Sequence, residues 1–181
     1  MKGYFMGSVS RKVLSYAPCP VFMVKESVHR PVKIVLAVDG SDASTRAAKY
    51  LCSWVSPEAV SVHVLSVAPK TFRGLGPSVR AKPYSQTLRQ AIRKEAQETI
   101  VRVRTLLMKK NFQVTAEVGS GDPRATILDC LVNREASLAV LGAKGLTGPE
   151  RFHMGSVSEW VAAYAGCSML VVRPSIKGKR A

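Results

Sequence analysis

A glycine motif near the end of the chain has the residue types and the spacing to bind an anion. Gly142 and Gly145 are followed, after nine residues, by Gly155 and Ser156. Glycines let backbone N–H groups approach a ligand closely and accept a positive φ without a Cβ penalty. A helix that begins at Gly155 adds unpaired N–H groups and the positive end of its dipole. The motif therefore predicts an anion site, most simply for phosphates.

The segments around the motif indicate how it is positioned. An apolar run at 137–141 precedes it and an amphipathic segment follows, an order that indicates a strand, a glycine loop and a helix. The same alternation begins near residue 32, with apolar, β-branched runs typical of strands buried on both faces. The expected strands are 33–38, 59–67, 112–118, 138–141 and 168–172, and the expected helices are 43–54, 85–110, 123–133 and 155–164.

This order predicts an α/β fold, a doubly wound five-stranded parallel sheet with helices on both faces. In such folds ligands bind beyond the carboxyl ends of the strands, where the strand order reverses. Asp39 follows the first of these strands and Gly142 the fourth. If those two strands are neighbours, Asp39 and the glycine motif face one crevice. The segment 68–85 is long, rich in Pro and Gly and without periodicity, which is typical of a lid, a binding loop or disorder.

The second half of the glycine motif recurs near the start of the chain. When residues 6–25 are moved forward by 148 positions, ten of the twenty fall on identical residues. Chance would give roughly one or two matches, so this is an internal repeat. It covers only the last helix and the last strand. We interpret residues 1–25 as the remnant of a preceding copy, 26–31 as a linker, 32–174 as the complete domain and 175–181 as a basic tail; a meaningless remnant is the alternative.

The repeated strand, residues 20–24, has two candidate partners. An edge strand presents unpaired backbone groups and favours a partner strand. Residues 20–24 could supply that partner within this chain or to a second chain. Gly7 and Ser8 repeat the end of the glycine motif, but no GxxG precedes them. We therefore expect no second nucleotide site in the first copy.

Together these features resemble the adenine-nucleotide-binding branch of the universal stress protein family. The family's phosphate motif, G-x2-G-x9-G-[ST], is matched by Gly142, Gly145, Gly155 and Ser156, and its first-strand signature by residues 38–41. The match covers about residues 32–173. The resemblance implies an adenine nucleotide alpha hydrolase-like sheet with strand order 3-2-1-4-5. It also implies a homodimer that forms through the last strand.

The resemblance further implies a role for individual residues. Asp39 would lie near the adenosine, and Val64 would meet the adenine through its backbone. Lys144, Gly145 and residues 155–158 would hold the phosphates. A magnesium ion held through the nucleotide would have Asp39 as its protein ligand. Helix capping by Asp39 or Ser156, and a solvent-directed Lys144, are the competing interpretations. The expected nucleotide-binding residues are Ala37, Val38, Asp39, Val64, Leu141, Gly142, Lys144, Gly145, Gly155, Ser156, Val157 and Ser158.

The chain is strongly basic, with 27 Lys and Arg against 12 Asp and Glu and a formal net charge of +15. Such a surface attracts anions, including nucleic acid and acidic lipids. Within 85–110, however, the basic residues alternate with apolar ones, as on a helix with one exposed and one buried face. No recognised nucleic-acid motif accompanies the charge. We interpret it as a solvated face and keep nucleic-acid binding as the weaker alternative.

Several other classes of protein are disfavoured by the sequence. No apolar run approaches the ~20 residues of a membrane span, and the N-terminus shows no convincing cleavage site, so we expect a cytoplasmic protein. The four cysteines form no C-x-x-C pair and the three histidines are scattered, so a metal site built from them is not expected.

The expected ligand is ATP, or ADP or AMP, bound by a nucleotide-dependent stress-response or regulatory module. We see no nucleophile–base pair, so we expect no enzyme, with slow ATP hydrolysis left open. An ATP-independent dimerisation or interaction module is the alternative.

Overall fold

The structure is a computed structural model of the 181-residue chain, and it describes residues 7–25, 32–72, 82–83, 85–145 and 154–173. The helices are α1 (Ser8–Tyr16), α2 (Asp42–Trp54), α3 (Gln86–Met108), α4 (Pro123–Asn133) and α5 (Ser156–Tyr164), with a short 3-10 helix at Pro57–Ala59. The strands are β1 (Val21–Met23), β2 (Val32–Val38), β3 (Val60–Ala68), β4 (Thr71–Phe72), β5 (Lys82–Pro83), β6 (Gln113–Ser120), β7 (Leu138–Gly142) and β8 (Ser168–Val172).

Six strands form the central sheet, in the order β1-β8-β7-β2-β3-β6. The strands from β8 to β6 run parallel to one another, whereas β1 joins the outer edge of β8 in the antiparallel direction. The sheet is therefore six-stranded and mixed rather than five-stranded and wholly parallel, and β1 extends the predicted order 3-2-1-4-5 at the β8 edge. The N-terminal strand adds a sixth member because the edge of β8 presents backbone groups that a partner strand satisfies.

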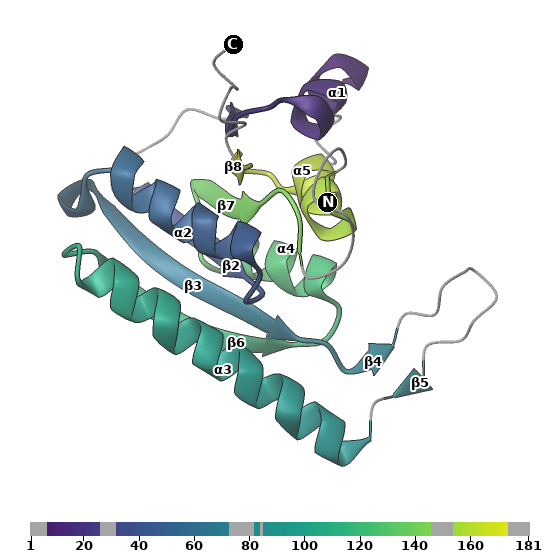
Figure 1. The fold of residues 1–181 in the computed structure, drawn as a ribbon. Coiled ribbons are helices and arrows are strands. Elements are labelled where there is room, and N and C mark those ends of the chain that lie inside the picture. Colours follow the sequence, from purple (N-terminus) through teal and green to yellow (C-terminus); the bar gives the residue numbers. More distant parts are fainter. Residues whose placement is uncertain (1–6, 26–31, 73–81, 84, 146–153, 174–181) are drawn as a thin grey trace, which may run out of the picture.

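Helices cover both faces of the sheet, as predicted (Figure 1). Alternate residues of β2 point to opposite faces: Leu36 packs into a core with α2 and α3, and Val35 into a core with α4 and α5. Both cores are apolar and continuous across several strands. The doubly wound arrangement therefore follows from strands that are hydrophobic on both sides.

The segment 68–85, predicted as an aperiodic loop, contains one further element. β4 and β5 pair there as a two-stranded antiparallel ladder, with Thr71 opposite Pro83. Residues 73–81 and 84 lie outside the described residues, so the predicted role of this segment as a lid or binding loop stays a prediction.

The helix starts fall into two groups. Side chains accept hydrogen bonds from first-turn N–H groups at Ser41 before α2, Ser85 before α3 and Asp122 before α4. α5 and α1 instead begin after Gly155 and Gly7, with no side-chain cap among the described residues. The first N–H groups of α5 are therefore left without a side-chain acceptor.

The N-terminal segment lies at the β8 edge of the molecule, where α1 sits near α5 (Figure 1). Leu14 of α1 is buried in the same core as Val161 of α5. The homodimer predicted to form through the last strand needs the outer edge of β8. In this structure β1 pairs with that edge within one chain, and the homodimer stays a prediction.

The long basic helix α3 is amphipathic, as predicted. Ala96, Ile100, Val103 and Leu107 face the core, whereas most of its basic side chains are exposed. No helix in the described part of the chain combines the length and the apolar character that crossing a membrane requires.

Candidate functional site

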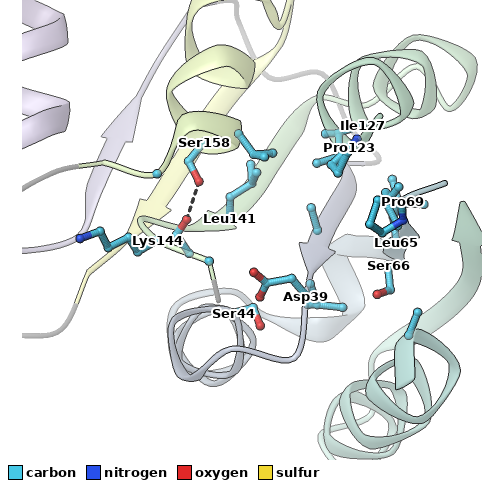
Figure 2. Close-up of a pocket in the computed structure, with 18 of the residues that line it drawn as sticks. Asp39, Ser44, Leu65, Ser66, Pro69, Pro123, Ile127, Leu141, Lys144 and Ser158 are labelled. Atoms are coloured by element: carbon cyan, nitrogen blue, oxygen red, sulfur yellow. Dashed lines mark hydrogen bonds between the residues drawn. The ribbon is translucent and has the colours of Figure 1, made fainter. Parts of the chain in front are cut away.

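A cavity of about 430 Å³ opens at the carboxyl ends of β2, β3 and β7 (Figure 2). β2 lies between β3 and β7, so this is the point at which the strand order reverses, where α/β folds bind ligands. The predicted residues that line this cavity are Ala37, Val38, Asp39, Leu141, Gly142, Lys144, Gly145, Gly155, Ser156, Val157 and Ser158. Positions far apart in the sequence are thus brought to one site.

Val64 is the predicted residue that does not line the cavity. Its side chain is fully buried in the core beneath α2 and α3. The wall on β3 is formed by the next residues, Leu65, Ser66 and Val67. The part of β3 that lines the cavity thus begins one position after Val64, and a backbone contact of Val64 with the adenine stays a prediction.

The cavity also has walls that sequence reasoning missed. Pro123 and Ile127 come from the start of α4, and Ile92 and Glu95 from α3. The topology brings both helices to the carboxyl edge of the sheet, but which of their residues face the cavity depends on how they pack. The remaining lining residues are Ser44, Pro69 and Ala96.

Asp39 is held by its own turn and lies against the glycine motif. Its Oδ1 accepts hydrogen bonds from the Ser41 backbone N–H at 3.0 Å and the Ser41 hydroxyl at 2.6 Å. The turn relies on Gly40, whose φ of +84° favours glycine. A Cβ placed on Gly145 would lie 2.5 Å from Asp39 Oδ2. A side chain at 145 would therefore require the Asp39 carboxylate to shift.

The start of α5 is fastened to the end of β7. The Ser158 hydroxyl donates to the Gly142 carbonyl at 2.8 Å, and the Gly155 N–H donates to the Ala143 carbonyl at 2.7 Å. A Cβ on Gly142 would lie 2.7 Å from the Ala43 carbonyl carbon, so this glycine is required where β7 meets α2. The hydroxyl proton of Ser158 is engaged in this contact and is not directed at a phosphate.

The cavity has one apolar and one polar end. Leu65, Val67 and Ile127 provide apolar wall, whereas Asp39, Gly145 and Ser156 gather near the uncapped start of α5. The Lys144 side chain points away from Asp39 (Figure 2). The attraction for an anion therefore comes from the N–H groups and dipole of α5. Residues 146–153, between the two halves of the motif, lie outside the described residues.

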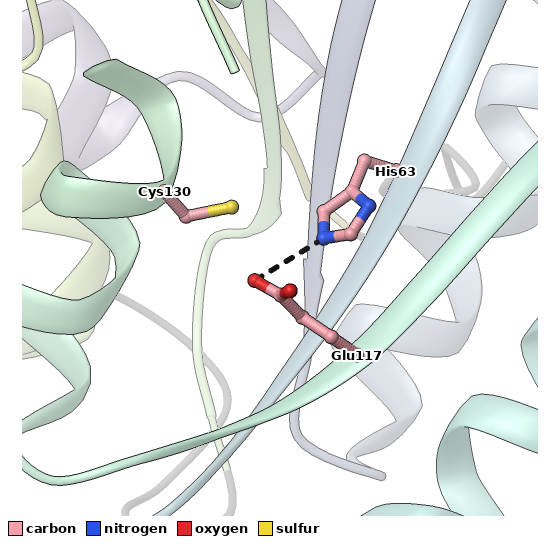
Figure 3. A group of neighbouring side chains, drawn as sticks. All are labelled: His63, Glu117 and Cys130. Atoms are coloured by element: carbon pink, nitrogen blue, oxygen red, sulfur yellow. Dashed lines mark ion pairs between the residues drawn. The ribbon is translucent and has the colours of Figure 1, made fainter. Parts of the chain in front are cut away.

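A second group of polar side chains lies elsewhere in the same domain (Figure 3). His63 Nε2 is 3.4 Å from Glu117 Oε1, and potential ligand atoms of His63, Glu117 and Cys130 all lie within 4.8 Å of one another. His63 Nδ1 is 2.8 Å from the Thr115 hydroxyl. Sequence spacing missed this group because its members come from β3, β6 and α4.

The charges in this second group balance without a metal ion. Burial, reinforced by the nearby Arg134 guanidinium, lowers the pKa of His63 and keeps the imidazole neutral. Burial and the Glu117 carboxylate raise the pKa of the Cys130 thiol to about 11. Arg134 Nη2 pairs with Glu117 Oε2 at 3.1 Å. We interpret the group as a structural network in which the Arg134 guanidinium offsets the charge of Glu117.

The chain matches the model of the Universal stress protein family over residues 32–173. It belongs to the universal stress protein family. Among curated relatives, Universal stress protein MJ0531 of Methanocaldococcus jannaschii is 32% identical over 144 residues, which cover 78% of this chain and 81% of that protein. The family match over residues 32–173 contains every residue that lines the cavity.

Several solved structures share the fold. An Arabidopsis thaliana family protein with AMP bound aligns with a TM-score of 0.58 at 16% identity, covering 79% of this chain and 92% of that chain. A universal stress protein in complex with cAMP aligns with a TM-score of 0.57 at 17% identity, covering 78% of this chain and 97% of that chain. The functionally unknown protein PA1789 of Pseudomonas aeruginosa aligns with a TM-score of 0.63 at 22% identity, covering 94% of this chain and 58% of that chain. The last match extends well beyond residues 32–173.

Proposed function

We propose that this universal stress protein binds one adenine nucleotide, ATP or its products ADP or AMP, in the cavity at the carboxyl ends of β2, β3 and β7. The observation that carries the proposal is that Asp39 and both halves of the glycine motif line that one cavity. The AMP and cAMP complexes of family members support the choice of an adenine nucleotide.

The polarity of the cavity fits the parts of such a ligand. An adenine ring has apolar faces, which suit the wall formed by Leu65, Val67 and Ile127. The phosphates suit the start of α5, where Gly155 provides no side-chain cap and the first-turn N–H groups would donate to a bound phosphate. Gly145 lets the backbone come close to the same region.

A magnesium ion held through the nucleotide would also fit the residues present. Asp39 and Glu95 both line the cavity, and carboxylate and phosphate oxygens are ligands that Mg²⁺ prefers. The ion would offset the repulsion between the Asp39 carboxylate and the phosphates. Asp39 is the protein ligand in this proposal, because its Oδ2 lies against Gly145.

The role we propose is regulatory rather than enzymatic. Among the described residues around the cavity we find no nucleophile paired with a base. A bound nucleotide would join α5, β7 and the turn at Asp39, and binding would stabilise the conformation in which those elements meet. Cytoplasmic localisation and the absence of enzymatic turnover stay predictions.

Calorimetric titration of the purified chain with ATP, ADP and AMP tests the proposal, with and without Mg²⁺. We expect Asp39→Asn to weaken MgATP binding about tenfold or more, because it removes a charge-assisted contact worth about 1.5–3 kcal/mol. Glu135→Gln is the matched control, since it neutralises an exposed carboxylate that pairs with Lys33 away from the cavity. Failure of the wild-type chain to bind any adenine nucleotide at millimolar concentration would contradict the proposal.

A further inference from the structure

The contact between the N-terminal segment and the complete domain has the symmetry of a dimer of identical copies. β1 pairs with β8 through Val21↔Val171, Phe22↔Leu170 and Met23↔Met169. The repeat offset of 148 makes Leu170 the counterpart of Phe22, since 22 + 148 = 170. The central pair thus joins a position to its own counterpart. This is the register that a two-fold axis through the centre of the ladder requires.

Contacts at the helix ends follow the same symmetry. Lys25 Nζ donates to the carbonyls of Ala162 at 2.8 Å and Ala165 at 2.6 Å, at the end of α5. Arg173 Nη2 donates to the carbonyls of Leu14 and Ser15, at the end of α1. Lys25 and Arg173 are counterparts in the repeat, since 25 + 148 = 173. Each cation therefore binds the carboxyl end of the other copy's helix, where a positive charge is favourable.

From this reciprocity we propose that residues 7–25 take the place of a second subunit at the β8 edge. The segment closes that edge within the chain and keeps two chains from joining through it. When β1 is displaced, two β8 strands can pair about a true two-fold axis centred on Leu170. In that pairing, Arg173 of each chain would bind the end of the partner's α5, as Lys25 binds the end of α5 here.

The segment has the advantage of being tethered. β1 is separated from β2 by β8 and β7, a distance of three strand spacings or about 14 Å. The seven residue steps from Lys25 to Val32 reach up to about 23 Å. A short tether of this kind gives an effective concentration of about millimolar. A second chain at micromolar concentration therefore competes poorly for the same edge.

Sedimentation velocity of the full 181-residue chain tests the proposal. We expect the wild type to remain monomeric over micromolar to tens of micromolar concentrations. In Phe22→Pro/Lys25→Glu, a proline interrupts the β1 ladder and a carboxylate faces the α5 carbonyls, so we expect a dimer that grows with concentration. Lys12→Glu is the matched control, because Lys12 is an exposed cation on α1, and it should remain monomeric. A dimeric wild type, or a folded double variant that stays monomeric, overturns the proposal.

Oxidative cross-linking decides the question even if the double variant does not fold. Val21→Cys and Val171→Cys place thiols at directly paired positions, in a Cys19→Ser background that removes the exposed native thiol. We expect a cross-link within one chain. A cross-link between two chains would show that β1 or β8 pairs in trans, and it would overturn the proposal. Neither experiment depends on nucleotide binding.

Discussion

The two copies of the repeated helix and strand have similar sequences but different surroundings. Gly155 precedes α5, and the Ala143 carbonyl oxygen lies 3.4 Å from where its Cβ would be. At Gly7, which precedes α1, no heavy atom of the described residues beyond its chain neighbours comes within 4 Å of that point. Val161 is fully buried, whereas its counterpart Val13 is 49% exposed. A helix that begins after a glycine therefore lines the cavity only in α5, where β7 and the glycine loop pack against its start.

The same comparison explains what α1 and β1 retain. Leu14 is buried in the core of the complete domain, and β1 is hydrogen-bonded to β8. The first copy thus keeps the surface that one copy presents to another. Val13 is exposed on the face of α1 that corresponds to the face of α5 packed against the sheet. The repeated helix and strand thus contact the complete domain in residues 7–25, whereas in the complete domain the start of the helix lines the cavity.

The largest expected difference between the copies is in the cost of removing a valine side chain. Val161→Ala should lower the free energy of unfolding by about 2 kcal/mol, because it deletes fully buried methyl groups. Val13→Ala should cost less than about 0.5 kcal/mol. Both changes gain the same helix propensity, so the pair is matched. Urea denaturation measures the difference, and equal losses would show that α1 and α5 are packed alike.

A smaller expected difference concerns the two helix-starting glycines. Gly155→Ala should weaken nucleotide binding about tenfold, or ~1.4 kcal/mol, because its methyl group would stand in the cavity wall that the phosphates approach. The backbone at 155, with φ −66° and ψ 147°, accepts alanine without strain. Gly7→Ala should leave the affinity unchanged. Calorimetric titration of both variants with the nucleotide measures the difference. Equal losses of affinity in Gly155→Ala and Gly7→Ala would contradict it.

The smallest expected effect is a pH dependence confined to the complete domain, since His63 has no counterpart in residues 7–25. Burial lowers the pKa of His63 in the folded chain, so the unfolded chain binds its proton more readily. Stability should therefore fall as the pH drops below about 6.5, the pKa of an unperturbed histidine, and through the lower folded pKa.

Unfolding of wild type and His63→Asn by urea, between about pH 7.5 and pH 5.5, measures this dependence. The slope of stability against pH should be shallower in the variant. A wild type that gains stability on acidification relative to His63→Asn would contradict the assignment of a neutral, buried imidazole.

Much of the fold could be predicted because its signals are local. The apolar runs located the five strands of residues 32–173, and Asp122 with Pro123 marked the start of α4 as the structure has it. The antiparallel addition of β1 could not be derived, because backbone pairing at an edge accepts a strand from the same chain or from another. The sequence left both partners open.

The candidate site shows the same division. The spacing of the glycines and the position of Asp39 after a strand indicated residues that do meet at one cavity. Walls such as Ile92 and Ile127 were missed because they depend on how α3 and α4 pack, which periodicity does not specify. The His63, Glu117 and Cys130 group was missed for the same reason, since only the fold brings three separate elements together.

The stoichiometry of nucleotide binding tests most directly whether one copy forms a site and the other does not. Titration calorimetry of the wild-type chain with MgATP, at a known active concentration, measures it. We predict one nucleotide per chain, with binding weakened about tenfold or more by Asp39→Asn and unaffected by Gly7→Ala. Two nucleotides per chain would show that the N-terminal copy also binds, and no binding of MgATP, ADP or AMP would show that the cavity is not an adenine-nucleotide site.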